Sequence, residues 1–177
     1  MFEIILGCGI IVLLLITMIT IYHNKFQYVI IKIEEAENNI NILLDKKQEL
    51  LNRARPIIKK ELKLDEFLEE IEKIENKGLN QFQMNSWLKD SYFDLVKLID
   101  ENEKLYKSEA LVSILEELGD NEDMIVGSIN YYNDSVVNFN KLVMSFPAKI
   151  VAFLFRYKKK EFHNNEKKEM YQILNEK

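Results

Sequence analysis

The sequence contains few residues that break regular structure. Its 177 residues include 5 glycines, 2 prolines and 1 cysteine, whereas 47% of them are hydrophobic. Because turns between short elements rely on glycine and proline, a chain this poor in both is expected to form long helices. The single cysteine, Cys8, cannot form a disulfide within the chain and leaves the redox compartment open. The length allows one domain with a substantial core and a tail.

Histidine is also scarce and the glycines are not grouped, which argues against an enzyme. A di-iron helical bundle needs Glu-x-x-His motifs on facing helices, and neither His23 nor His163 has a glutamate three positions before it. The glycines are too scattered for a phosphate-binding loop, and Cys8 lies in an apolar run. The acidic stretches at 34–37 and 69–72 have the pattern of solvated helix faces. We therefore expect no catalytic residue, no cofactor and no metal site.

The chain has no overall excess of positive charge, since its formal net charge is −5. That balance argues against nucleic acid as a partner. The charge is uneven, however, because residues 148–177 contain eight basic and four acidic side chains. The C-terminal part is therefore net positive, and the rest of the chain is strongly acidic.

Residues 4–22 contain no charged side chain and read IILGCGIIVLLLITMITIY. About 19 apolar residues in a helix cross a hydrocarbon core of roughly 30 Å, so this run predicts a transmembrane helix behind a short flank at residues 1–3. A cleaved signal peptide would have a basic flank and small residues at a cleavage site, but the flank here is MFE and the run ends in TIYHNKF. A lipoprotein would need an apolar region ahead of Cys8. We therefore expect an uncleaved single-pass anchor.

Basic residues near the span predict its orientation. No lysine or arginine precedes the span, whereas Lys25 and Lys32 follow it. Basic residues accumulate in cytoplasmic segments next to a span. We therefore expect the C-terminal domain to lie in the cytoplasm.

Residues 26–162 have the pattern of a helical bundle. From Ile33 to Ile58, apolar side chains recur at steps of three, four and seven residues, as in an amphipathic helix. Pro56 removes one backbone hydrogen bond from this helix, so we expect a kink near Asn52. The first bundle helix is thus predicted to be long and bent.

The rest of the bundle is predicted from the same periodicity and from glycine and proline residues at the expected helix ends. The expected features are continuation of the first helix over 64–74, a stop at 76–78, helices at 80–107 and 109–145, a local kink at 119–120, a short helix after Pro147, and a flexible charged tail at 163–177. The predicted fold is all-α. It consists of an N-terminal transmembrane helix and an antiparallel up-and-down bundle of three long helices plus a short C-terminal helix.

A seam of apolar residues marks the last long helix. Its members are spaced alternately by three and four, as in helices that pack along a seam: Ile129, Tyr132, Val136, Phe139, Val143 and Phe146. Asn133 and Asn140 are seven residues apart and border this seam. A buried amide without a partner costs roughly 1–3 kcal/mol, so we expect both to hydrogen-bond to a facing helix and fix the bundle register. A ligand site, or surface positions without a role, are the alternatives.

This part of the chain resembles the LemA family. The resemblance is carried by Tyr132, Asn133, Val136, Phe139, Asn140, Phe146, Pro147 and Ala152, and upstream by residues 33–60 with Pro56. It implies a single-pass bacterial membrane protein with an antiparallel helical bundle. It implies no established enzymatic activity. The family commonly has a glycine in the loop after the apolar run, where this chain has Arg156.

Residues 147–160 combine an apolar stretch with a basic cluster. Such a segment can lie at an anionic membrane interface or contact a partner, and the residues expected to do so are Phe153, Phe155, Arg156, Lys158, Lys159 and Lys160. The alternative is a helix that caps the bundle with its lysines in water. If three long helices alternate in direction, Pro147 lies far from the anchor, and the segment would meet a partner or an opposed membrane.

These features support two main functional hypotheses. The first is a membrane-tethered, non-enzymatic structural or protein-interaction module, with the membrane and unidentified proteins as partners and self-association as a further option. The second is a lipid-binding, membrane-shaping protein that acts through residues 147–160. A signalling regulator in envelope stress is a third hypothesis, which the sequence does not separate from the first.

Overall fold

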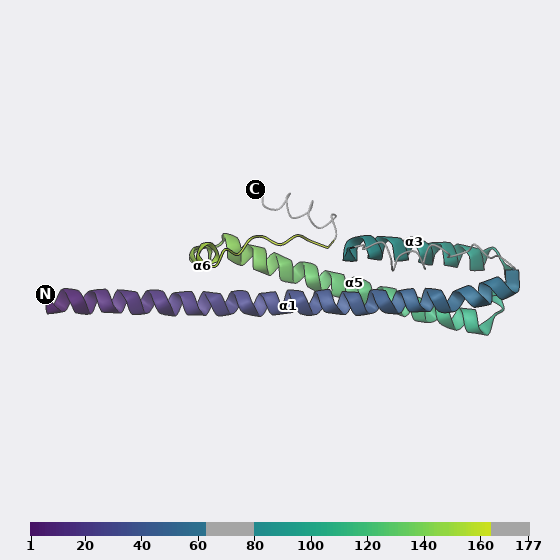
Figure 1. Cartoon of the computed structure of the whole chain (residues 1–177), viewed down its shortest axis with the longest axis horizontal. Coiled ribbons are helices and arrows are strands. Elements are labelled where there is room, and N and C mark those ends of the chain that lie inside the picture. The colour runs from purple at the N-terminus through teal and green to yellow at the C-terminus, as the bar shows by residue number, and fades with distance from the viewer. Residues whose placement is uncertain (63–79, 164–177) are drawn as a thin grey trace. The chain divides into compact units, whose positions relative to one another are not determined.

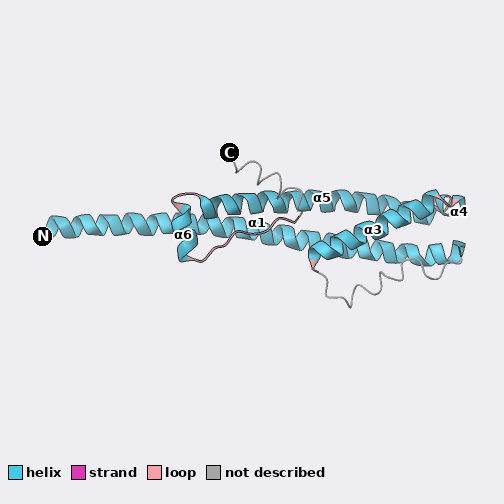
Figure 2. Cartoon of the chain, turned by 90° about the horizontal axis from the view of Figure 1, so that it is seen from above, coloured by secondary structure: helices cyan, strands magenta, loops and turns pink. Residues whose placement is uncertain are grey.

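A computed structural model of the chain describes residues 1–62 and 80–163, and these residues form helices joined by short connections (Figure 1; Figure 2). The helices are α1 (Phe2–Leu62), α3 (Gln81–Asp100), α4 (Glu103–Tyr106), α5 (Glu109–Met144) and α6 (Ala148–Leu154). No strand occurs in the described part of the chain. The predicted all-α bundle with a long apolar N-terminal helix is thus confirmed. The expectations for 64–74, 76–78 and nearly all of the tail fall outside the described residues.

The helix ends follow from local sequence signals. Asn80 caps α3, because its Oδ1 accepts a 3.0 Å hydrogen bond from the Gln83 N–H, and the Gln83 Oε1 accepts one of 3.1 Å from the Asn80 N–H. The helix predicted over 80–107 is interrupted after Asp100. There the Asn102 Nδ2 donates to the Leu98 carbonyl at 2.8 Å, and α4 begins one residue later. An asparagine that binds the preceding turn in this way favours a helix end.

Two expected disturbances do not interrupt a helix. Pro56 lies inside α1, which continues to Leu62. Gly119 lies inside α5, which is one helix over 36 residues. Apolar packing on one face of each helix is the physical reason, since it offsets the loss of one hydrogen bond or the flexibility of one glycine.

The fold divides into two compact units. The first, here called the terminal unit, contains residues 1–36 and the chain from 131 onward. The second, the central unit, contains residues 37–130. The long helices α1 and α5 each contribute residues to both units.

In the central unit, α3 runs in the same direction as α1, and α5 runs opposite to it. Gln81, at the start of α3, donates from Nε2 to the Glu37 carbonyl at 2.9 Å and to the Asn41 Oδ1 at 2.8 Å. Further along both helices, the Lys47 Nζ lies 5.4 Å from the Tyr92 ring centroid. The predicted alternation, with the second described helix returning toward the anchor, is therefore wrong. The connection from Leu62 to Gln81 lies outside the described residues.

The core of the central unit is made of aliphatic side chains from these helices. Its members are Ile40, Leu44, Leu50, Leu51, Ala54, Ile58, Leu88, Leu95, Ile99, Leu105, Leu111, Ile114, Leu118 and Ile125. Leu105 belongs to α4, and the others recur at helical spacing along α1, α3 and α5, as the periodicity predicts.

In the terminal unit, α5 returns along α1 and ends beside the last turns of the apolar run. Phe26 of α1 and Phe139 of α5 meet edge to face, with ring centroids 5.6 Å apart. After Met144 the chain turns, and α6 points 92° away from the direction of α5. Figure 2 shows α6 running across the direction of α1, and Figure 1 shows it nearly end-on beside α1. Because α5 is antiparallel to α1, Pro147 lies near the end of the apolar run, contrary to the prediction that placed it far away.

Candidate functional site

The N-terminal part of α1 is long and apolar enough to cross a membrane, and none of its most apolar window is buried. Helices with this property include membrane anchors and signal sequences. The helix continues without a break beyond Tyr22, and Phe26 is completely buried in the terminal unit. The apolar run and the folded unit are therefore joined by rigid helix rather than by a linker.

Aromatic residues join the end of the apolar run to the rest of the terminal unit. The His23 ring lies 4.4 Å from that of Phe155, and the Phe26 ring lies 4.7 Å from that of Tyr157. The Tyr157 hydroxyl accepts a 2.8 Å hydrogen bond from the Gln27 Nε2 and lies 3.3 Å from the His23 Nδ1. The segment after α6 is thus fixed to α1 within five residues of the end of the apolar run.

The two asparagines of the family motif hold the extended segment that follows α6. The side-chain amide of Asn140 forms two hydrogen bonds of 2.9 Å with the backbone of Lys160, one to its carbonyl and one from its N–H. The Asn133 Oδ1 accepts a 2.8 Å hydrogen bond from the His163 N–H. Tyr132 donates from its hydroxyl to the Glu161 carbonyl at 3.1 Å. These contacts pair side chains of α5 with a segment that has no helix or sheet partner of its own.

The hydrogen-bond partners of Asn133 and Asn140 differ from the expected ones. Both asparagines are buried, as expected, but they bind the backbone of residues 160–163 rather than a facing helix. An extended backbone presents an N–H and a carbonyl side by side, which matches the donor and acceptor of one amide group. The motif asparagines therefore determine the path of the C-terminal segment.

Arg156 makes the turn between α6 and this extended segment. Its φ of 57° lies in the left-handed region, where glycine is free of steric strain. The Tyr157 N–H donates to the Ala152 carbonyl at 2.9 Å, and the Arg156 N–H donates to the Phe153 carbonyl at 3.3 Å. This is the Schellman pattern that ends helices. A glycine would adopt this turn without strain, whereas this chain adopts it with arginine.

α6 is amphipathic. Ala148, Val151 and Ala152 are buried against the terminal unit. The opposite side of α6 exposes Ile150, Phe153 and Leu154, with Phe153 84% exposed, and the adjoining Phe146 and Phe155 are exposed as well. Basic side chains flank this apolar face: Lys149, Arg156, Lys158 and Lys159 are exposed, and Lys160 is half-buried.

The remaining predicted motif residues lie as follows. Tyr132, Val136, Phe139 and Ala152 are buried. Phe146, expected in the seam, is 83% exposed, because α5 ends at Met144 and the helical spacing no longer applies beyond it. The motif thus combines core positions with one exposed residue at the start of the α6 surface.

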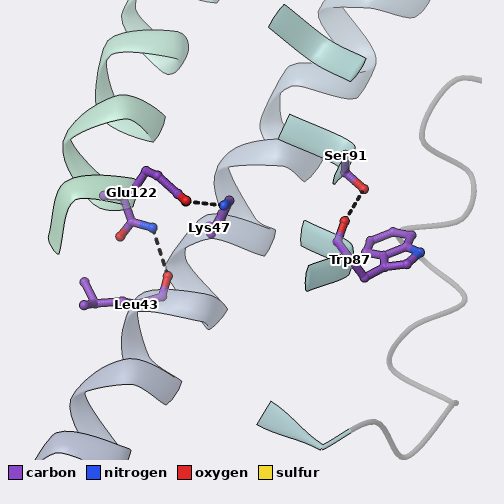
Figure 3. A network of polar contacts seen from close by, with 6 residues as sticks. Leu43, Lys47, Trp87, Ser91 and Glu122 are labelled. Carbon is purple, nitrogen blue, oxygen red and sulfur yellow. Dashed lines mark hydrogen bonds and ion pairs between the residues drawn. The ribbon is translucent and has the colours of Figure 1, made fainter. Parts of the chain in front are cut away.

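The central unit contains a buried charge that sequence reasoning missed. Lys47 is completely buried in α1 and forms an ion pair with Glu122 of α5 (Figure 3). Beside it, the Asn121 Nδ2 donates to the Leu43 carbonyl at 3.0 Å. Burial lowers the pKa of Lys47, and Glu122 partly opposes that shift. Burial together with the Glu122 charge raises the pKa of Tyr92.

A sequence signal for this buried charge does exist. Lys47 follows Leu44 by three residues and precedes Leu51 by four, so it occupies a position of the apolar seam of α1. A lysine at a seam position needs an acidic partner on a facing helix. Among residues 1–62 and 80–163, no three His, Cys, Asp or Glu side chains are grouped as a metal ion would require.

Comparisons with known proteins give one match. A model of the LemA family matches residues 38–173. The match begins after the apolar run and covers more than half of the chain, including both motif asparagines and all of α6. No curated protein and no solved structure matches the chain.

Proposed function

The chain belongs to the LemA family, and we propose that this member is a non-enzymatic structural module anchored in the bacterial cell membrane. In this proposal α1 crosses the bilayer once over residues 4–22. The folded part stands on the membrane and offers its outer surfaces to other proteins. α6 makes a second contact with the same bilayer.

The observation that carries this proposal is the position and direction of α6. The segment after it contacts His23, the first residue beyond the apolar run, so Phe155 lies at the level where the span would end. α6 turns 92° from α5, which itself runs along α1. If α1 crosses the bilayer along its normal, α6 lies in the membrane plane. An amphipathic helix in that orientation inserts its apolar face into the interface.

The composition of this surface supports the same contact. The exposed Phe153 of α6 and the phenylalanines on either side of the helix suit the acyl boundary. The flanking basic residues suit anionic headgroups, and each contributes roughly 1 kcal/mol near the surface. Tyr22, His23 and Tyr157 form an aromatic layer of the kind that is enriched at the membrane interface. The capping-helix alternative offers no reason for Phe153 to be exposed.

We place the folded part in the cytoplasm. No basic residue precedes the apolar run, and Lys25 and Lys32 follow it. The basic side chains around α6 support the same side, because the cytoplasmic leaflet carries the more negative surface. In this orientation, Phe93→Cys in a Cys8→Ser background is protected from an impermeant maleimide in intact cells. Labelling there would reverse the orientation.

The membrane contact of α6 is tested by comparing two exposed phenylalanines. Phe153→Cys and Phe93→Cys, each in the Cys8→Ser background, are labelled with an environment-sensitive fluorophore and reconstituted at full length in vesicles with anionic lipid. We expect a blue-shifted emission and quenching by a lipid-borne quencher at position 153 only. Equal, water-like emission at both positions would support the capping helix instead.

The interaction role is proposed for the central unit, whose exposed large apolar side chains on three helices, including Ile42, Phe93 and Met124, are candidate contact positions. Proximity labelling from the central unit in living cells tests this role, since it reports both the neighbours and the membrane side. Reproducible enrichment of particular proteins over a membrane-anchored control supports it. Labelling that does not differ from the control contradicts it.

Membrane shaping through residues 147–160 is the second candidate. The position of α6 beside the span supports it, because the segment can then reach the membrane in which the protein is anchored. Charge reversal at Arg156, Lys158, Lys159 and Lys160 separates the two roles. Loss of lipid binding with unchanged protein neighbours favours membrane shaping. Loss of the neighbours with unchanged lipid binding favours the interaction module.

A further inference from the structure

An open groove lies between α1 and α5 in the terminal unit, next to the end of the apolar run. Its volume is about 660 Å³. It is lined by Ile21, Asn24, Lys25, Tyr28 and Val29 of α1 and by Asn138, Lys141, Leu142 and Ser145 at the end of α5. Its α1 side therefore begins within the last turn of the apolar run and extends about two turns beyond it.

The chemistry of the groove is that of an anion site with an apolar side. Lys25 and Lys141 are the charged residues of the lining, and no acidic residue is among them. Two asparagine amides and the hydroxyls of Tyr28 and Ser145 add hydrogen-bonding groups. Ile21, Val29 and Leu142 supply apolar contact. Lysines beside neutral donors are the groups that bind phosphate, and aliphatic side chains suit an acyl chain.

A second groove of similar size, in the central unit, has a different charge pattern. It has a volume of about 640 Å³ and lies along α1 in the central unit. Asp45 and Glu49 are in its lining together with Arg53, so its charge does not favour an anion. Of these two grooves, the one with a basic lining lies next to the apolar run.

Neighbouring aromatic residues support the basic side of the groove. The Lys25 Nζ lies 5.1 Å from the Tyr22 ring centroid. The Lys32 Nζ lies 4.5 Å from the Tyr28 ring centroid, and interaction with Tyr28 raises the pKa of this lysine. Such cation–π contacts orient a cation that is otherwise mobile. Lys25 and Lys32 of α1 and Lys141 of α5 thus place three positive charges in or beside the groove.

We propose that this groove binds the headgroup of one anionic phospholipid together with the beginning of its acyl chains. Lys25 and Lys141 contact the phosphate, the asparagines and Ser145 bind headgroup or glycerol oxygens, and Ile21 and Leu142 contact the chains. The volume is within the usual range for a small-molecule site and holds part of a lipid. The proposal depends on the membrane anchor of the proposed function, and it adds a lipid class and a site separate from α6.

The test uses the full-length protein in nanodiscs that contain equal amounts of phosphatidylglycerol and phosphatidylcholine with the same acyl chains. Native mass spectrometry counts the lipids retained after release. We expect one phosphatidylglycerol retained in preference to phosphatidylcholine. Because two lysines each contribute roughly 1 kcal/mol, Lys25→Gln with Lys141→Gln should weaken this retention about thirtyfold, at 1.4 kcal/mol per tenfold.

Two further variants keep the proposal falsifiable. Lys46→Gln with Lys97→Gln removes the same charge from exposed positions of the central unit and should leave retention unchanged. Asn138→Trp fills the groove, leaves both lysines in place and should also abolish retention. A wild-type protein without preferential retention, or a Lys25/Lys141 double variant that equals the wild type, overturns the proposal. So does a bound peptide or a second copy of the chain in the groove.

Failure of this site is distinguishable from failure of the anchor. If α1 does not span the bilayer, the wild-type protein does not incorporate into nanodiscs as an integral membrane protein. If the anchor holds and the groove does not bind lipid, incorporation is normal and only the retained lipid is missing. Both groove variants should incorporate as the wild type does.

Discussion

The terminal and central units both bury polar side chains of long helices, but they satisfy them in different ways. In the terminal unit, the neutral amides of Asn133 and Asn140 bind the backbone of an extended segment. In the central unit, Lys47 is charged, completely buried and paired with one carboxylate, Glu122. A neutral amide in hydrogen bonds loses little when it leaves water. A buried cation depends on its partner, because an unpaired charge in the interior is costly.

The largest expected effect in this comparison is at the buried ion pair. Glu122→Ala leaves the Lys47 ammonium without its partner, and we expect the free energy of unfolding to fall by about 3 kcal/mol. Chemical denaturation of the full-length protein in detergent measures it. Glu117→Ala is the matched control, since it removes the exposed Arg53–Glu117 pair of 3.5 Å and should have little effect.

The partner substitution tests the same explanation. Lys47→Met removes the buried cation and leaves Glu122 near the surface, where water can solvate it. This change should be much less harmful than Glu122→Ala, and adding it to Glu122→Ala should restore most of the lost stability. Equal losses from both single substitutions would show that packing, rather than charge burial, determines the effect.

A smaller effect is expected at the amides of the terminal unit. Asn140→Ala removes two hydrogen bonds from the Lys160 backbone and leaves its N–H and carbonyl unpaired, so we expect a loss of about 2 kcal/mol. Hydrogen exchange should also become faster in residues 157–163 and stay unchanged in α3. Asn130→Ala, at an exposed position of the same helix, is the control. Slow exchange in residues 157–163 of the Asn140 variant would contradict the role of Asn140 in holding this segment.

A substitution at the Arg156 turn should increase stability, unlike the substitutions above. The left-handed φ of this residue is strained for arginine, and Arg156→Gly relieves that strain, so we expect stabilisation by about 1 kcal/mol, partly offset by the greater freedom of glycine in the unfolded chain. Lys158→Gly, two residues further along, has only the second effect and should destabilise. Thermal unfolding in neutral detergent distinguishes the two, because no anionic lipid is present. Destabilisation by both substitutions would contradict the strained turn.

The sequence predicts the helices well and their contacts less well. The last long helix was expected over 109–145 and is α5, Glu109–Met144. Its apolar spacing also predicts the burial of Tyr132, Val136 and Phe139. Periodicity carries this information because it reports which face of one helix avoids water.

Periodicity does not report direction or irregular partners. Apolar spacing does not encode whether α3 runs parallel or antiparallel to α1. The partner of the motif asparagines is backbone, and every residue has the same backbone groups. Lys47 was missed for another reason: the seam was read from apolar residues alone, so a charged member of it was passed over. The contacts that hold the candidate site together are therefore the part that needs the structure.

The smallest effect expected is a pH dependence confined to the terminal unit. His163 is buried, its backbone N–H binds Asn133, and its ring lies 6.0 Å from that of Tyr132. Burial lowers the pKa of His163 from its ordinary value of 6.5. Below pH 6.5 the unfolded chain therefore takes up a proton that the folded unit does not, and stability falls as the pH decreases toward the lowered pKa.

Unfolding measured above and below pH 6.5 should show this loss for the wild type, with faster exchange in residues 157–163 on the acidic side. His163→Phe keeps a ring at this position without a titrating group and should remove that local pH dependence. If the acid-sensitive exchange persists in that variant, another titrating group weakens the contacts between residues 160–163 and α5.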